Sequence, residues 1–93
     1  MLSKIPIDLA NIPQGASDRE ILRVAIIAEL DAINLYEQLA AMTGDKHLKI
    51  VLMDVAKEEK THVGEFQALL LRLDREQKAE LAEGEKEVDE LTG

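Results

Sequence analysis

The sequence predicts an all-α fold in which two long helices form an antiparallel hairpin and a short third helix follows. Two long segments carry apolar residues at alternating spacings of three and four, which is the period of one helix face. Between them Gly44 and Asp45 interrupt the pattern, and so short a connection makes neighbouring helices antiparallel. Two copies of such a hairpin are expected to dimerise into a four-helix bundle.

The chain is small for a protein that stands alone. Its 93 residues make at most one domain, and a chain this short buries a limited core. With one Tyr, one Phe and no Trp, that core is aliphatic. Because 46% of the residues are hydrophobic, the chain is too apolar to stay disordered, and burial against a partner copy is expected.

The first predicted helix covers residues 18–43. Ser17 is expected to be its N-cap, and Glu20, three residues later, completes a capping box. Residues 1–16 precede this helix, and their two prolines and one glycine predict an extended arm.

The second predicted helix covers residues 46–73, directly after the break. A third segment, residues 75–91, follows Asp74, which offers an N-cap. Its composition is helical, but Gly84 interrupts it and its apolar residues are few. They are Leu81, Val88 and Leu91. This segment is therefore expected to be either a helix of low intrinsic stability or a mobile tail.

Charge and composition exclude several classes of function. A net charge of −8 opposes binding to nucleic acid, which needs clustered Lys and Arg, and to an anionic membrane surface. The absence of cysteine excludes disulfides, thiolate zinc sites and cysteine nucleophiles. The first ten residues do not have the pattern of a secretory signal, and no segment is long and apolar enough for a membrane span. A cytoplasmic protein is expected.

Acidic and imidazole side chains interrupt the apolar row on each long helix. The first row consists of Leu22, Ile26, Glu29, Ile33, Tyr36 and Ala40. The second row consists of Leu48, Leu52, Val55, Glu59, His62, Phe66, Leu69 and Leu73. A carboxylate in a row that packs against another helix is costly unless its charge is compensated.

The interruptions lie at the same height in an antiparallel hairpin. Glu29 lies fifteen residues before Gly44, and Glu59 lies fifteen residues after it. At a rise of about 1.5 Å per residue, both lie roughly 22 Å from the turn. His62 is one turn further along the same face as Glu59, because residues three apart are neighbours on a helix. Two carboxylates and an imidazole are therefore expected to converge.

This convergence predicts half of a metal site. Di-iron carboxylate bundles use one Glu from each of two helices and a Glu-x-x-His from each of the other two, which is twice what this chain contains. A two-fold dimer would supply four carboxylates and two imidazoles. Oxygen-rich ligands with one imidazole per metal suit iron or manganese, whereas structural zinc prefers sulfur or more histidines. Glu58 and Glu65 lie off the row, and His47 lies at the turn, so these three are expected to be solvated.

Two stretches resemble the encapsulated ferritins, the ferritin-like cargo of encapsulin nanocompartments. The first helix of that family, in which a tyrosine follows a glutamate by seven residues, is similar to AELDAINLYEQLA, with Glu29 and Tyr36. The second helix, with its Glu-x-x-His, is similar to DVAKEEKTHVGEF, with Glu59 and His62. The resemblance covers residues 17–92.

The resemblance implies an enzyme, a ferroxidase that oxidises Fe²⁺ to Fe³⁺ with O₂ at a di-iron centre shared between two subunits. It implies that Glu29, Glu59 and His62 are the catalytic iron ligands, that Glu59 bridges the metal ions and that Tyr36 lies beside them. The family also places acidic residues around the first ligand, where metal enters. Asp31 suits that role, although position 28 is alanine.

The resemblance also implies partners and a location. It implies rings of dimers, typically decamers, that deliver Fe³⁺ to an encapsulin shell protein for storage, inside a nanocompartment in the cytoplasm. The sequence ends at EVDELTG without an evident capsid-targeting peptide. Both a free cargo and a domain of a fusion with the shell are therefore expected possibilities.

Two other classes of function remain open at the level of the sequence. In one, Glu29, Glu59 and His62 form a metal-free ion-pair network that sets the register of a helical assembly module. In the other, the same ligands belong to a rubrerythrin-like peroxidase. Rubrerythrins usually add a cysteine-ligated iron site, so the absence of cysteine counts against that class.

Overall fold

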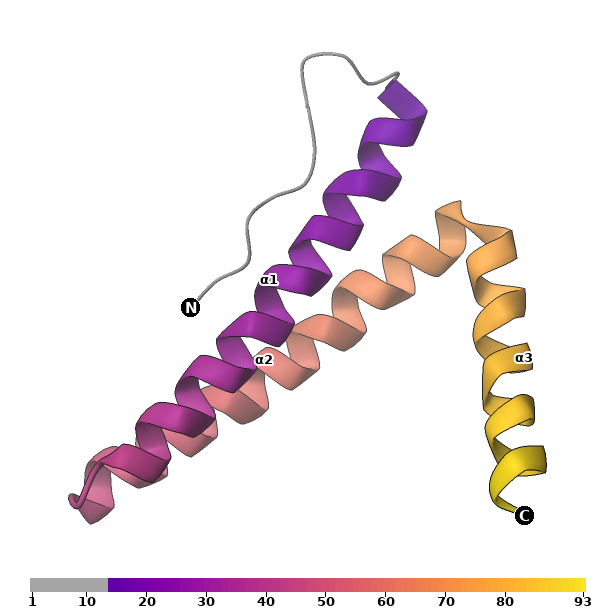
Figure 1. The fold of residues 1–93 in the computed structure, drawn as a ribbon. Helices are drawn as coiled ribbons and strands as arrows, with labels where there is room; N and C mark the ends of the chain where they lie inside the picture. The colour runs from indigo at the N-terminus through magenta and orange to yellow at the C-terminus, as the bar shows by residue number, and fades with distance from the viewer. Residues whose placement is uncertain (1–13) are drawn as a thin grey trace.

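The computed structural model describes residues 14–93, which form three helices and no strand. Helix α1 spans Gln14–Met42, α2 spans Lys46–Leu73 and α3 spans Arg75–Thr92. α1 and α2 lie side by side as an antiparallel hairpin, and α3 turns away from its open end (Figure 1). The predicted all-α hairpin with a short third helix is confirmed. None of these helices is long and apolar enough to cross a membrane.

Helix α1 begins earlier than predicted. Its first residue is Gln14, so Ser17 lies inside the helix and the prediction of an N-cap at Ser17 is wrong. A glycine such as Gly15 costs a helix about 1 kcal/mol but does not end it, so the helix extends back to Gln14. Residues 14–16, which were predicted to belong to the extended arm, are therefore helical. The rest of the predicted arm, residues 1–13, lies outside the described residues.

Aspartate caps determine where α2 and α3 begin. The Asp45 side chain accepts a hydrogen bond from the backbone N–H of Leu48 at 2.9 Å, and α2 begins at Lys46 as predicted. The Asp74 side chain likewise accepts a hydrogen bond from the backbone N–H of Gln77 at 2.9 Å. Both caps satisfy backbone donors that a helix leaves unpaired in its first turn.

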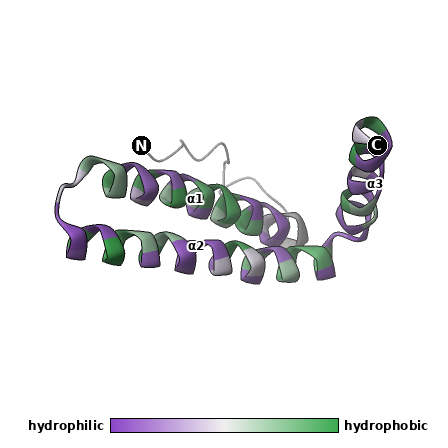
Figure 2. Ribbon diagram, turned by 90° about the horizontal axis from the view of Figure 1, so that it is seen from below, coloured by the Kyte–Doolittle hydropathy of each residue, from purple (hydrophilic) through white to green (hydrophobic). Residues whose placement is uncertain are grey.

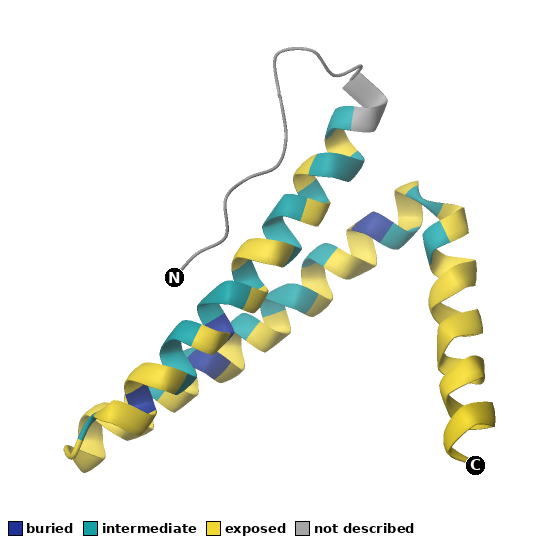
Figure 3. Ribbon diagram, viewed as in Figure 1, coloured by how far each residue is buried: buried dark blue, intermediate teal, exposed yellow. Residues whose placement is uncertain are grey.

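The core of the single chain is small. Among the described residues, the buried apolar side chains are Ile33 and Ala40 on α1, and Ala56 and Leu70 on α2. Two of these four are alanines, which let the helix backbones approach closely. Figure 2 shows apolar residues distributed along both helices, and Figure 3 shows how few of them a single hairpin buries.

The predicted apolar row of α2 does not face α1 along its whole length. Ala56 and Leu70 are the buried residues of α2, and neither belongs to that row. Leu48, Leu69 and Leu73 do belong to it, and all three are exposed in the single chain. The row is therefore turned partly toward α1 and partly toward solvent. It contains more apolar surface than the hairpin itself covers.

Helix α3 runs without interruption through Gly84. The structure therefore shows a helix where the sequence left a helix or a mobile tail open. None of its residues is buried (Figure 3), and Leu81, Val88 and Leu91 are all exposed. Because helices in proteins are stabilised mainly by packing, α3 receives little support from this chain.

Candidate metal centre

Three side chains predicted from the sequence meet in the middle of the hairpin. Glu29 lies on α1, Glu59 and His62 lie on α2, and one ligand atom of each lies within 4.8 Å of the others. His62 Nδ1 lies 3.4 Å from Glu59 Oε2 and 3.6 Å from Glu29 Oε2. The structure thus brings together the two carboxylates and the imidazole. This agrees with the sequence, in which Glu29 and Glu59 lie equally far from the turn.

Helix geometry explains this meeting. Glu59 and His62 are three residues apart, so they are neighbours on one face of α2. The side chains of Glu29 and Glu59 are only 19% and 18% exposed, whereas that of His62 is 40% exposed. The three groups therefore lie at the edge of the hairpin core, where they can still be reached from outside. Glu58, Glu65 and His47 are exposed, as expected.

One carboxylate oxygen in this cluster is buried without a hydrogen bond. Glu29 Oε2 is inaccessible to solvent and has no hydrogen-bond donor. Its 3.6 Å separation from His62 Nδ1 is too long for a hydrogen bond. A buried, unpaired carboxylate oxygen is costly, and a bound cation would remove that cost. The residues present fit a divalent metal ion.

The donor set indicates which metals suit the site. Two carboxylates and one imidazole favour metals that accept oxygen ligands, such as iron or manganese. Structural zinc sites are usually four-coordinate and rich in Cys and His. Three protein ligands leave coordination positions for further donors. The single chain therefore offers half of the ligand set found in di-iron bundles.

The other two predicted residues lie outside the cluster of three. Tyr36 is partly buried and follows Glu29 by seven residues, which keeps it on nearly the same face of α1, two turns closer to the hairpin turn. Asp31 is two residues from Glu29, a rotation of about 200° around the helix. Among the described residues, the cluster of acidic and histidine side chains does not include Asp31.

Sequence reasoning missed an ion pair beside the cluster. Lys60 Nζ lies 3.2 Å from Glu37 Oε2, and so links α2 to α1 next to Glu59. Helical side chains lean toward the N-terminus, and in an antiparallel hairpin this directs Lys60 and Glu37 toward each other. This tilt of the side chains is the feature from which the ion pair could have been predicted. Both side chains are substantially exposed, at 59% and 40%, so the pair contributes about 1 kcal/mol at most.

Comparisons with known proteins show which family the chain resembles. Residues 7–87 match the family described as EncFtn-like. The chain is 66% identical over 74 residues to the ferritin-like-encapsulin shell fusion protein of Pyrococcus furiosus, which covers 80% of this chain and 21% of that protein. It is 40% identical over 75 residues to the encapsulin nanocompartment cargo protein EncC of Myxococcus xanthus, which covers 77% of this chain and 58% of that protein. The chain thus spans only part of the length of both relatives.

A solved structure has the same fold. The crystal structure of the encapsulated ferritin domain from Pyrococcus furiosus superposes with a TM-score of 0.86 at 54% sequence identity. The match covers 100% of this chain and 95% of that one. At this identity the likeness extends to sequence as well as to backbone.

Proposed function

This chain belongs to the EncFtn-like family, and from that premise we propose that it is a ferroxidase, which oxidises Fe²⁺ to Fe³⁺ with O₂ at a di-iron centre formed between two copies. The observation that carries the proposal is the cluster of Glu29, Glu59 and His62, in which Glu29 Oε2 is buried without a hydrogen bond. A partly buried, oxygen-rich cluster with an unsatisfied carboxylate is suited to a cation.

The ligand set requires two copies, and the charge of the two copies requires metal. Two copies of Glu29 and Glu59 bring together four negative charges, which repel one another unless they take up protons or bind cations. Two Fe²⁺ ions carry four positive charges and make the centre neutral. Two copies of His62 complete the set of four carboxylates and two imidazoles that di-iron bundles use.

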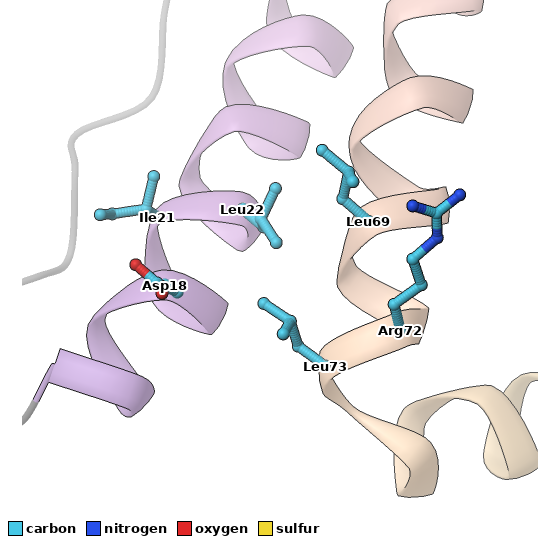
Figure 4. A pocket seen from close by; sticks show the side chains of 6 residues that line it. All are labelled: Asp18, Ile21, Leu22, Leu69, Arg72 and Leu73. Atoms are coloured by element: carbon cyan, nitrogen blue, oxygen red, sulfur yellow. The ribbon is translucent and has the colours of Figure 1, made fainter.

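Exposed apolar surface on the same face supports the second copy. An apolar pocket of about 340 Å³ lies at the open end of the hairpin (Figure 4). Leu22, Leu69 and Leu73 line it, and all three belong to the apolar rows that contain the cluster. Leu69 and Leu73 are 46% and 49% exposed, so the single chain leaves apolar surface on this side of the hairpin open to solvent. We propose that a second hairpin packs on this surface.

In this proposal iron is the substrate, and the carboxylates favour its oxidation. The attraction between an anionic oxygen and a cation grows with the cation charge, so Glu29 and Glu59 stabilise Fe³⁺ more than Fe²⁺. Each Fe²⁺ gives up one electron, and O₂ is the electron acceptor. His62 contributes a neutral nitrogen donor, which adds a ligand without adding charge. Glu59 is the proposed bridge between two ions, on the family resemblance.

We further propose that the oxidised iron passes to an encapsulin shell. One relative is a fusion of a ferritin-like protein with an encapsulin shell, and another is the cargo of an encapsulin nanocompartment. The proposed location of this chain is the interior of such a compartment in the cytoplasm. Rings of dimers, such as decamers, are the proposed assembly.

The alternative of a metal-free assembly module makes a different prediction for iron. His62 lies near both carboxylates, so a charged imidazole would also suit a network without metal. Anaerobic titration with Fe²⁺, followed by metal analysis of the separated protein, distinguishes the two. The ferroxidase is expected to bind about two irons per dimer and to turn over further Fe²⁺ in air. A folded dimer that retains no iron would support the module instead.

A further inference from the structure

The corner between α2 and α3 is a single residue, Asp74. Its backbone φ and ψ are −125° and 89°, so the chain leaves the helical conformation there and resumes it at Arg75. Figure 1 shows α3 departing in a new direction from this point. A one-residue link is a hinge with two free dihedral angles, and something else must fix the direction of α3.

Asp74 bonds to all three helices at this corner. Its backbone N–H donates to the Leu70 carbonyl of α2 at 2.9 Å. Its Oδ1 atom accepts the hydrogen bond from the Gln77 backbone N–H of α3, and its Oδ2 atom accepts a hydrogen bond from Arg23 Nη2 of α1 at 2.8 Å. The carboxylate is thus divided between the start of α3 and the side of α1.

The surroundings of Asp74 favour its charged form. The hydrogen bond from the Gln77 backbone, followed by the hydrogen bond and charge of Arg23, holds the pKa of Asp74 below its ordinary value against the opposing effect of burial. The side chain of Asp74 is 16% exposed and that of Arg23 is 48% exposed. The pair therefore lies at the surface but involves a shielded carboxylate.

Within the single chain, apolar packing does not fix α3 in place. No residue of α3 is buried, and Leu81, the large apolar residue of α3 nearest the corner, is 43% exposed. An open cavity of about 390 Å³ separates α3 from the hairpin, lined by Leu81 on one side and by Ile27 and Leu71 on the other. A cavity of this size leaves room for α3 to take other directions.

We propose that the Arg23–Asp74 ion pair fixes the direction of α3 relative to the hairpin. The N-cap determines where α3 begins, and the bond to Arg23 adds an anchor on α1, away from the axis of α2. Two anchors on different helices restrict a hinge that one anchor leaves free. This positioning role is independent of the iron chemistry, because the pair does not touch the cluster of Glu29, Glu59 and His62.

Distance measurements between spin labels test the proposal. The chain has no cysteine, so Gln38→Cys on α1 and Glu87→Cys on α3 give two unique, exposed labelling sites. Labelled chains are mixed with an excess of unlabelled chains so that distances within one chain dominate. The unmodified corner is expected to give one narrow distance distribution.

Two variants remove the ion pair in different ways. Asp74→Ser keeps a side chain that can cap α3. The serine side chain is shorter than that of aspartate and carries no charge, so it cannot form the ion pair with Arg23. Arg23→Met keeps the Asp74 cap intact and removes the donor on α1. Both are expected to lose the narrow distance peak while keeping their helix content by circular dichroism. Arg75→Met, which removes an equal charge next to Asp74, is expected to keep the peak.

Three results would contradict this role of the Arg23–Asp74 pair. A narrow peak retained in both Asp74→Ser and Arg23→Met would mean that packing, around Leu81 or against another copy, holds α3 instead of this pair. Equal broadening in Arg75→Met would mean that overall charge acts rather than this pair. A broad distribution before any substitution at the corner would mean that the direction of α3 is not fixed.

Discussion

The buried oxygen of Glu29 on α1 lies 3.6 Å from Nδ1 of His62 on α2, and no hydrogen bond reaches it. The separation is short enough for one cation to contact both groups and too long for the groups to satisfy each other directly. The hairpin therefore holds the two carboxylates and the imidazole close enough together for one cation to contact all three. This relationship predicts that replacing Glu29 has opposite effects on stability and on iron binding.

Replacing Glu29 by Gln is expected to stabilise the metal-free protein. Glutamine keeps the shape of the side chain but removes a shielded charge that repels Glu59 and the acidic groups of a second copy. We expect a gain of about 1 kcal/mol in the free energy of unfolding, together with loss of iron binding. Chemical denaturation at one protein concentration, without metal, measures the first effect.

The matched control for that stability change is Glu37→Gln. It makes the same chemical change on α1 but breaks the exposed ion pair with Lys60. Its free energy of unfolding is expected to fall by about 1 kcal/mol or less. If Glu29→Gln proves as destabilising as Glu37→Gln, Glu29 is already satisfied in the metal-free protein.

Replacing Glu59 by Ala is expected to remove far more activity than replacing Glu58 by Ala. Glu59 lies in the cluster, whereas Glu58 is exposed and rotated about 100° around α2. We expect Fe²⁺ oxidation in air to fall at least about tenfold in Glu59→Ala and to change little in Glu58→Ala. Equal losses in the two variants would show that the wrong face of α2 has been assigned to iron.

The sequence predicts the hairpin because its signals are local. Asp45 and Asp74 lie where α2 and α3 begin, and α2 occupies the predicted residues, Lys46–Leu73. The meeting of Glu29 with Glu59 follows from counting residues to a short turn. Such inferences need only the helix rise and the antiparallel connection.

The remaining features depend on contacts that counting does not give. Ser17 has the side chain of an N-cap, but Gln14 to Ala16 are also compatible with a helix, so α1 begins earlier. Which of the neighbours Leu69 and Leu70 is buried depends on how far α2 is rotated about its axis, and the structure buries Leu70. The apolar row of α2 could not reveal that rotation, because its residues are shared between α1 and a surface that the single chain leaves uncovered.

Iron and dimerisation are expected to be thermodynamically linked. Without metal, the four carboxylates of two copies repel or take up protons, and bound metal removes both penalties. A ligand that binds only the assembled state favours assembly by mass action. Sedimentation velocity at dilute protein, with and without Fe²⁺ under anaerobic conditions, should show a shift toward the dimer or larger assemblies with iron.

The control for this linkage is Glu29→Gln, in which the metal-free dimer loses repulsion between its carboxylates and the shared centre no longer binds iron. Its distribution of oligomers is expected to be insensitive to Fe²⁺. A distribution that does not change with iron in the unmodified protein, across dilute concentrations, would argue against a shared centre.

The isolated protein is expected to oxidise iron but not to store it. Two hairpins are consumed in building one bundle and one centre, so a ring of bundles encloses no volume. Fe³⁺ released into bulk water hydrolyses, and visible precipitate is expected at high iron loading in air. Co-assembly with an encapsulin shell is expected to keep the same iron soluble. Size-exclusion chromatography after loading, with metal analysis of each fraction, checks this, and hundreds of irons eluting with the shell-free protein would point to a self-sufficient cage.

Iron-loaded crystals, with diffraction recorded on both sides of the iron absorption edge, would locate the metal itself. We expect two anomalous peaks between two hairpins, each within bonding distance of Glu29, Glu59 and His62 contributed by the two copies. The Glu59→Ala variant, crystallised and loaded in the same way, should lack both peaks. Iron bound by one chain alone, or bound away from these three residues, would contradict a di-iron centre shared between copies.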